Sequence, residues 1–175
     1  GFYSFCRRSE ILGMKFNHLE FLDEGIQILI PFSKTDQIGE GRYIFIAKKN
    51  DKYCPVNSLK KWLEIIRIEN EDPLFYSINK SNKFNKYMLN KKNQKISLSD
   101  SSFVKILKNR AQLAGLNEIE KISGHSLRRG AISEARRNDL SINDIKAQSG
   151  HKSSQMIDLY SKVSDIKKTS VTKKI

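Results

Sequence analysis

GHSLRRGAISEARRNDLSINDIKAQSGHKSSQMIDLY, residues 124–160, is the stretch that decides how the rest of the chain is interpreted. It contains four side chains that can bind or attack a phosphate, namely His125, Arg128, His151 and Tyr160. His125 and Arg128 are 3 positions apart, so they share one face if this segment is helical. Together these side chains offer a nucleophile, a guanidinium and two imidazoles.

Small and polar residues precede an amphipathic run in this stretch, which predicts the start of a helix. The apolar residues of that run are Leu127, Ala131, Ile132 and Ala135. The N-terminus of a helix presents free backbone N–H groups and therefore suits an anion. A second Gly-His pair, Gly150–His151, also precedes a helix-like run, which covers residues 153–160.

This motif resembles the C-terminal signature of the tyrosine recombinases, also called phage-type integrases. In that family the order is His-x-x-Arg, then Gly-His, then the nucleophilic Tyr, and the chain matches it with His125, Arg128, His151 and Tyr160. Arg128 and His151 are 23 positions apart, and Tyr160 lies 9 positions beyond His151; both spacings are typical of the family. The resemblance covers about residues 5–165 and implies the family's catalytic-domain fold, mainly α with a small antiparallel β-sheet at one edge.

The resemblance also implies a reaction. Tyr160 attacks one DNA strand and forms a 3′-phosphotyrosyl bond, and a 5′ hydroxyl is released. A phenol with a reference pKa of about 10 needs help at neutral pH. Arginines stabilise the charge on the phosphate, and histidines exchange protons with the phenol and the phosphate. The bond energy stays in the ester, so neither ATP nor a metal ion nor another cofactor is required.

In the family, an Arg followed by x-Ser-Glu-Leu supplies a first active-site guanidinium. The match is RRSEI at residues 7–11, which assigns that role to Arg7 and leaves Arg8 as the competing choice. The family usually has Gly two positions before this Arg, where this chain has Phe5. Apolar residues within 6–21 recur at roughly helical spacing, which predicts a helix there.

Residues 25–47 are predicted to form a β-hairpin. Isoleucines alternate in GIQILIPF, and Tyr43 and Phe45 alternate in RYIFIA. Lys34 lies where the first strand ends, 27 positions after Arg7. In the family a lysine of this hairpin reaches into the minor groove and protonates the leaving 5′ oxygen. The SKTDQ sequence around Lys34 assigns it that role.

Two further helices are predicted. One covers residues 53–68 and has Pro55 in its first turn. The other runs from about residue 99 to residue 114 and stops at Gly115. The side chains expected to be buried on these helices are Leu59, Trp62, Leu63, Ile66, Phe103, Ile106, Leu107 and Leu113. The intervening residues 79–95, rich in Asn and Lys, are expected to form a basic loop.

The composition indicates a nucleic-acid partner. The chain has 32 Lys plus Arg against 19 Asp plus Glu, a net charge of +13 and a pI near 9.7. This favours a polyanion, with double-stranded DNA first and a membrane surface as the weaker option. No apolar run reaches the roughly 18 residues that a spanning helix requires. Cys6 and Cys54 lack the pattern of a disulfide framework or a zinc site. These features favour a cytoplasmic setting, at the nucleoid in a bacterial host.

We expect residues 1–175 to form a single catalytic domain, in which 161–175 is a basic tail. The opening GFYSF resembles the end of a helix whose start is missing, so we expect a longer protein with a separate N-terminal DNA-gripping domain. By resemblance, we expect a homo-tetramer on paired DNA sites, with a monomer as an option in the absence of DNA. Further candidates for DNA contacts are Arg8, Arg129, Arg136, Arg137 and Lys152.

Three other functions stay open at this point. A type IB topoisomerase uses similar chemistry but relaxes supercoils, and the SKTDQ and CPV segments favour an integrase over it. A non-catalytic DNA-binding module would account for the charge but not for the spacing of the signature. A metal hydrolase using His18, His125 and His151 is disfavoured, because these histidines lack a ligand spacing and carboxylate partners.

Overall fold

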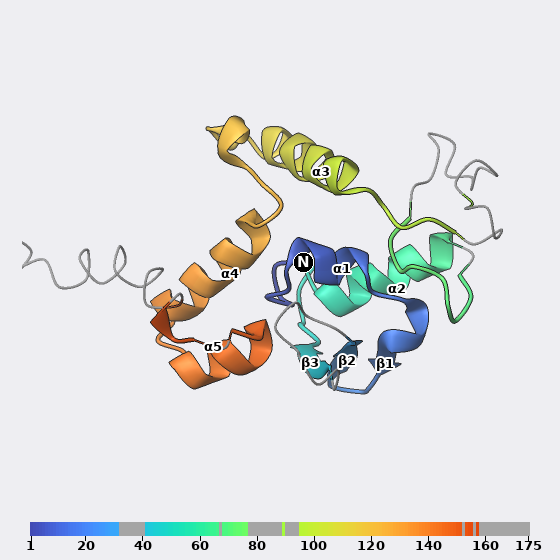
Figure 1. Cartoon of the computed structure of the whole chain (residues 1–175), viewed down its shortest axis with the longest axis horizontal. Coiled ribbons are helices and arrows are strands. Elements are labelled where there is room, and N and C mark those ends of the chain that lie inside the picture. The colour runs from blue at the N-terminus through green and yellow to red at the C-terminus, as the bar shows by residue number, and fades with distance from the viewer. Residues whose placement is uncertain are drawn as a thin grey trace, which may run out of the picture. The chain divides into compact units, whose positions relative to one another are not determined.

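The computed structural model describes residues 1–31, 41–66, 68–76, 89, 95–151, 153–155 and 157. The chain separates into two compact units, whose elements are drawn in Figure 1. The sheet unit runs from Arg7 to Gly124, and the signature unit combines Gly1–Cys6 with the chain from His125 onward. Within the described part of the chain, no helix has the length and apolar character needed to cross a membrane.

The sheet unit combines helices with one three-stranded antiparallel sheet in the order β1-β2-β3. Its elements are α1 (Arg8–Leu12), η1 (Phe16–His18), β1 (Leu19–Phe21), β2 (Gly25–Ile30), β3 (Arg42–Ala47), α2 (Pro55–Ile65), α3 (Asp100–Leu113) and η3 (Ile119–Lys121). The signature unit contains α4 (Ser126–Arg137) and α5 (Ile142–Ser149). The prediction of a mainly α fold with a small antiparallel sheet is therefore confirmed.

The predicted hairpin is present as β2 and β3, but the face that β3 buries differs from the expected one. Ile28 pairs with Ile44, and both side chains are buried. Tyr43 and Phe45, which gave the predicted alternation, lie on the opposite face and are 64% and 42% exposed. Phe45 packs over Gly25, where an added Cβ would lie 2.7 Å from the ring. The isoleucines form the core side because they pair with the isoleucines of β2.

The prediction of a helix over residues 6–21 is wrong beyond Leu12. Gly13 caps α1 and ends it, and a single 3₁₀ turn follows. The next residues form β1, whose Leu19 pairs with Ile28 of β2. The apolar spacing here is compatible with a helix, yet pairing with an existing strand satisfies the backbone and determines the structure.

Helix α2 begins as predicted, with Pro55 in its first turn and Cys54 before it. Trp62 is half-buried, and its indole N–H donates to the carbonyl of Leu74 at 2.9 Å. The Trp62 ring also lies near the ring of Tyr76. The tryptophan thus connects α2 to the segment that follows it, which supports its expected place in the core. Cys6 and Cys54 are both buried thiols that take no part in a disulfide.

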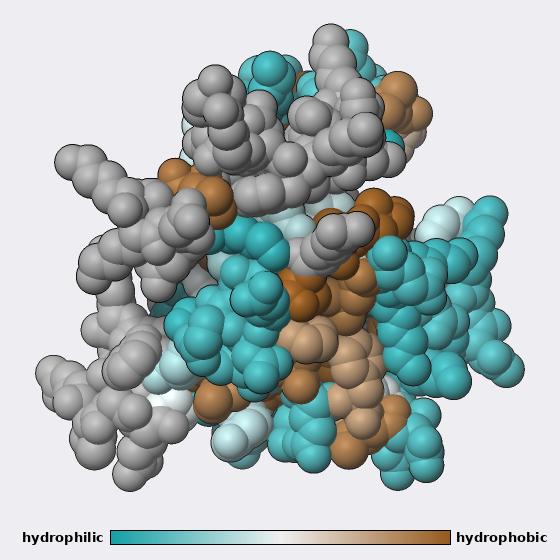
Figure 2. Space-filling view, turned by 90° about the vertical axis from the view of Figure 1, so that its right-hand side faces the viewer, coloured by the Kyte–Doolittle hydropathy of each residue, from teal (hydrophilic) through white to brown (hydrophobic). Residues whose placement is uncertain are grey.

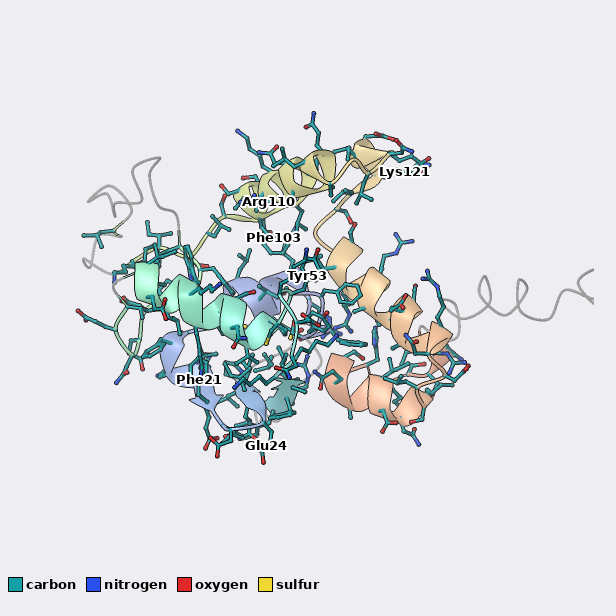
Figure 3. All side chains as sticks on the ribbon, turned by 180° about the vertical axis from the view of Figure 1, so that it is seen from behind. Phe21, Glu24, Tyr53, Phe103, Arg110 and Lys121 are labelled. Atoms are coloured by element: carbon teal, nitrogen blue, oxygen red, sulfur yellow. The ribbon has the colours of Figure 1, made fainter. Side chains whose placement is uncertain are left out.

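Helix α3 starts at a Ser99 cap and stops before Gly115, as predicted, but its buried stripe is narrower than expected. Phe103 and Leu107 are half-buried and Ala111 is buried, at the spacing i, i+4, i+8. The predicted burial of two other residues is wrong, since Ile106 is 47% and Leu113 is 78% exposed. They lie off the stripe because each helical residue turns the side chain by about 100°. Figure 3 shows Phe103 on α3 and Lys121 at η3.

In the signature unit, α4 begins at Ser126, within the stretch where the sequence predicted the start of a helix. Helix α4 buries Ala131, Ile132 and Ala135, and these residues follow one another at helical spacing. Ile132 packs in a cluster with Ile145 of α5 and Ile157, and Phe5 is packed against that cluster. The short N-terminal segment therefore belongs with the signature helices.

The surface carries apolar side chains as well as charged ones. Figure 2 shows hydrophobic residues reaching the surface beside hydrophilic ones. Large exposed apolar side chains of the sheet unit include Tyr43, Tyr53 and Leu113. Isolated exposed residues of this kind are normal in folded proteins and carry no function by themselves.

Candidate active site

Arg128 lies in the first turn of α4 and is buried, with an exposed fraction of 6%. Its Nη1 donates to the carbonyl oxygens of Phe5 and Ser149, each at 2.7 Å. A buried guanidinium needs acceptors for its N–H groups, and the two carbonyls accept the donors of Nη1 and help to fix the plane of the group. The remaining donors on Nη2 point toward His151.

His151 follows the last turn of α5 and is half-buried. Arg128 Nη2 lies 2.9 Å from its Nε2 and 3.1 Å from its Nδ1. The hydroxyl of Ser149 lies 2.8 Å from Nδ1. Gly150, between Ser149 and His151, has a φ of 69°, which is the left-handed conformation that favours glycine. This turn ends α5 and lets the ring return to Arg128, so two of the four signature residues come together.

His125 occupies the N-cap position of α4, one turn before Arg128. Its carbonyl accepts the N–H of Arg129 at 2.9 Å, while its side chain makes no capping hydrogen bond. The imidazole is exposed, in contrast to the buried guanidinium of Arg128. An exposed imidazole at a helix N-terminus is accessible to an anionic ligand.

Phe5, at the position where the family usually has glycine, has a φ of 55°. Its N–H donates to the carbonyl of Phe2 at 3.2 Å, and its own carbonyl accepts from Arg128. A left-handed conformation costs a non-glycine residue roughly 1–2 kcal/mol. The turn that glycine would form without strain is thus retained here with a phenylalanine.

Arg7 lies in the sheet unit, at the N-cap position of α1, and is held by Glu10. Arg7 Nη1 donates to Glu10 at 2.9 Å, and the Arg7 backbone N–H donates to the other carboxylate oxygen at 2.6 Å. Arg42 of β3 also donates to both oxygens, at 3.3 Å. The Glu10 side chain is 3% exposed, so it is a buried acceptor shared by two guanidinium groups.

The electrostatics of Glu10 follow from these contacts. Burial raises the pKa of its carboxyl group, but the Arg7 N–H and the positive charges of Arg42 and Arg7 outweigh burial, so the pKa is lowered. Glu10 is therefore ionised and keeps Arg7 oriented. The role of Glu10 and Arg42 was missed by sequence reasoning; the Glu of the RRSEI motif was the available signal.

Arg8, the competing choice for Arg7, has different partners. Its Nη2 forms an ion pair with Asp100 at the start of α3, at 2.5 Å. Its side chain also lies against Gly124, where an added Cβ would be 2.7 Å from Arg8 Cδ. Arg8 therefore connects α1 to α3 and to Gly124, and these contacts are those of a residue that stabilises the fold.

The other predicted site residues vary in their surroundings. Arg129 is exposed, Arg136 donates to the carbonyl of Leu140 at 3.3 Å, and Arg137 pairs with Glu134 at 2.8 Å. The remaining predicted residues, Lys34, Lys152 and Tyr160, lie outside the described residues.

The described residues contain no group of three or more His, Cys, Asp or Glu side chains that could hold a metal ion. His18, a member of the alternative metal set, accepts the Lys15 N–H through Nδ1 at 3.2 Å. Burial lowers the pKa of His18, and the charge of Lys15 lowers it further. These contacts account for His18 as a half-buried residue of the 3₁₀ turn.

Comparison with solved structures identifies the fold. The XerH site-specific recombinase bound to difH substrate has a TM-score of 0.65 at 20% identity, over 91% of this chain and 39% of that chain. The XerA recombinase has a TM-score of 0.64 at 21% identity, over 90% of this chain and 48% of that chain. The predicted catalytic-domain fold of the tyrosine recombinases is therefore confirmed.

Comparison of sequences identifies the family. An integrase/recombinase xerD homolog of Selenomonas ruminantium is 35% identical over 161 residues, which are 91% of this chain and 44% of that relative. The chain thus spans less than half the length of this relative. The sequence profile of the phage integrase family matches residues 2–166. With this match over nearly its whole length, the chain belongs to the phage integrase family.

Proposed function

We propose that this chain is the catalytic domain of a site-specific DNA recombinase that cleaves and rejoins strands through a 3′-phosphotyrosyl intermediate. The observation that carries the proposal is the Arg128–His151 pair, in which two carbonyls hold a buried guanidinium beside an imidazole. A positioned guanidinium next to a proton-transfer group suits a phosphodiester. Family membership supplies the matching context.

In the proposed reaction, the phenolic oxygen of Tyr160 attacks the phosphorus and the bond to the 5′ oxygen breaks. One of the imidazoles of His125 and His151 takes the phenolic proton, and the other donates to the phosphate. Lys34 gives a proton to the departing 5′ oxygen. A 5′ hydroxyl on a partner strand then reverses the step, so the ester conserves the bond energy.

The guanidinium groups of Arg7 and Arg128 stabilise the charge that builds on the non-bridging oxygens. The pairing of Arg7 with Glu10 supports this role, since an ionised carboxylate keeps the guanidinium from turning away. All proposed steps use side chains alone and need neither a metal ion nor ATP.

Double-stranded DNA is the proposed partner, and the net charge of +13 supports it. Among the proposed DNA contacts, Arg129 is exposed, whereas Arg8 and Arg137 are already paired with carboxylates. Lys152 and Arg136 complete the set. We further propose that residues 1–175 act as one catalytic domain in the cytoplasm, and that four copies assemble on paired DNA sites.

The decisive experiment uses a nicked suicide DNA substrate, in which the released fragment diffuses away and the covalent adduct accumulates. The wild-type chain should form an adduct on Tyr160, mapped by mass spectrometry, and Tyr160→Phe should bind DNA and form none. An adduct in the Phe variant would refute the assignment of the nucleophile. An assay for exchange between two duplexes then separates a recombinase from an enzyme that only relaxes supercoils.

A further inference from the structure

Arg42 is the first residue of β3, where it pairs with Ile30 of β2, and its side chain reaches Glu10 of α1. Its Nη1 donates to Glu10 Oε1 and its Nη2 to Oε2, each at 3.3 Å, so the contact is bidentate. Arg7 donates to the same two oxygens, through Nη1 and its backbone N–H. Each carboxylate oxygen therefore accepts a hydrogen bond from Arg7 and another from Arg42.

The carboxylate that orients Arg7 also opposes its charge. The Glu10 side chain is 3% exposed, and one negative charge beside one guanidinium would leave a neutral pair that attracts a phosphate poorly. Arg42 brings the sum over the three side chains to +1, because two guanidinium groups face one carboxylate. Removal of Arg42 lowers the charge beside Arg7 by one unit, and this difference does not depend on which other groups contact the three side chains.

The Arg7 side chain remains accessible to a ligand in this arrangement, since it is 26% exposed. We propose that Arg42 is a positioning residue, which compensates the charge of Glu10 so that the carboxylate can hold Arg7 without cancelling its attraction for the phosphate. This inference rests on the proposed function for its effect on cleavage. The contact of Arg42 with Glu10 does not itself depend on DNA.

The first test compares two variants of Arg42. Arg42→Gln keeps a hydrogen-bond donor and loses the charge, whereas Arg42→Lys keeps the charge and loses the bidentate geometry. In single-turnover reactions on the suicide substrate, Arg42→Gln should be slower than the wild type by roughly 10- to 100-fold, a smaller loss than for Arg7→Ala because Arg7 remains. Arg42→Lys should cleave within about 3-fold of the wild type. A wild-type rate in Arg42→Gln, or equal losses in the two variants, would overturn the proposal.

Lys95→Gln is the matched control. Lys95 forms an ion pair with Asp72 in the same unit, and the two side chains are 16% and 15% exposed. The control therefore also removes one positive charge from a partly buried pair, but not from the pair beside Arg7. It should cleave at the wild-type rate, at a temperature where circular dichroism shows all variants to be folded. A loss equal to that of Arg42→Gln would assign the effect to the charge of the whole protein.

A second substrate separates charge compensation from a general loss of structure. A methylphosphonate at the scissile position has a methyl group in place of a charged non-bridging oxygen, so less negative charge builds up in the transition state. On this substrate Arg42→Gln should differ from the wild type by less than about 3-fold. The same loss on both substrates would show that Arg42 supports only the fold.

A further measurement separates this inference from the proposed function. If the wild-type chain forms no adduct, the proposed function fails, while the pKa of Glu10 still reports on its contact with Arg42. In a ¹³C NMR titration of the carboxyl groups, Arg42→Gln should have a higher Glu10 pKa than the wild type, because the charge and hydrogen bonds of Arg42 lower it. An unchanged pKa would remove the basis of the proposal.

A double variant replaces Arg42→Gln if that protein does not fold. Arg42→Gln/Glu10→Gln has no carboxylate left to compensate, and loss of both partners avoids an uncompensated buried charge. Its cleavage of the phosphate substrate should therefore lie within about 10-fold of the wild type. A loss as large as that of Arg7→Ala would overturn the proposal.

Discussion

The carbonyl oxygen of Phe5 accepts a 2.7 Å hydrogen bond from Arg128 Nη1, and it does so from a backbone with a φ of 55°. The N–H of the same residue bonds to Phe2, so the strained turn is closed on one side and anchored to the signature helix on the other. Strain of this kind persists only where the surroundings determine the conformation. Here the Phe5 side chain, which packs against the cluster that contains Ile132, supplies that support.

The strain predicts an inverted order of stability for two variants at this position. Both Phe5→Ala and Phe5→Gly lose the packing of the ring, so both should be less stable than the wild type. Only glycine relieves the left-handed strain, by about 1 kcal/mol relative to alanine. Phe5→Gly should therefore have the higher free energy of unfolding in urea titrations. At an ordinary helical or extended position, the alanine variant would be at least as stable as the glycine variant. That result for Phe5 would show that the turn is unstrained.

The ion pairs of α1 predict that its two adjacent arginines differ in function. Arg7→Ala should slow adduct formation by about 10²–10³-fold, the loss seen when a charge-stabilising donor is removed. Arg8→Ala should cleave within a few-fold of the wild type, because the motif assigns the active-site guanidinium to Arg7 and the Arg8 side chain connects α1 to α3 through Asp100. Single-turnover rates on the suicide substrate measure both variants. The opposite pattern, with Arg8 essential and Arg7 dispensable, would move the register of the motif by one residue.

Local sequence patterns predicted several elements of this fold, whereas features that depend on long-range contacts were missed. The start of α4, the Pro55 helix and the β2–β3 pair follow from capping, spacing and alternation, all of which are properties of neighbouring residues. Strand β1 was missed because its three residues become a strand only through pairing with β2. The exposure of Leu113 was missed because apolar spacing alone does not say which side of α3 has a partner.

The residues of the candidate site show the same difference between local sequence patterns and long-range contacts. The resemblance to the family signature selected Arg128 and His151, and the structure brings them to within 2.9 Å. Ser149 could not be selected, because its contribution depends on the turn at Gly150 and on burial. The partnership of Glu10 with Arg42 joins residues that are 32 positions apart, and no local pattern indicates it.

The lowered pKa of Glu10 predicts a stability that depends on pH. A carboxyl group whose pKa is lower in the folded state stabilises the protein above its unfolded pKa, which is about 4.3 for Glu. That contribution is lost as the pH falls through the lower, folded pKa. Glu10→Gln removes the charge but keeps the shape, and it leaves Arg7 and Arg42 uncompensated. It should cost roughly 3 kcal/mol at neutral pH.

The difference in unfolding free energy between wild type and Glu10→Gln should shrink in acid, because the wild-type carboxyl is then protonated as well. Urea titrations from neutral pH down to about pH 3 would measure it. Glu71→Gln is a matched control, since the pKa of Glu71 is also lowered, first by its hydrogen bond with Lys15, but this pair is exposed. If the difference in unfolding free energy between wild type and Glu10→Gln does not vary with pH, an ionised carboxylate at Glu10 is ruled out as its cause.

The charge predicts a steep dependence of DNA binding on salt. Each neutralised phosphate of duplex DNA releases about 0.9 counterion, so the logarithm of the affinity should fall linearly with the logarithm of the salt concentration. Arg129→Ala removes one exposed guanidinium and should reduce the slope by about 1 if it contacts a phosphate. Fluorescence anisotropy at several salt concentrations measures the slope. Affinity that is insensitive to salt would argue against binding through the DNA backbone.

The last prediction concerns Lys34 as the general acid. If Lys34 protonates the departing 5′ oxygen, Lys34→Ala should cleave normal DNA slowly, because an alkoxide is a poor leaving group. A substrate with sulfur in place of the bridging 5′ oxygen needs no such proton, since a thiolate leaves readily. Cleavage of that substrate should therefore be nearly restored in Lys34→Ala. Arg128→Ala should remain defective on both substrates, because it lacks charge stabilisation rather than a proton donor. Adduct formation on the two matched substrates measures this directly, and equal defects of Lys34→Ala on oxygen and sulfur would make Lys34 a phosphate-binding residue instead.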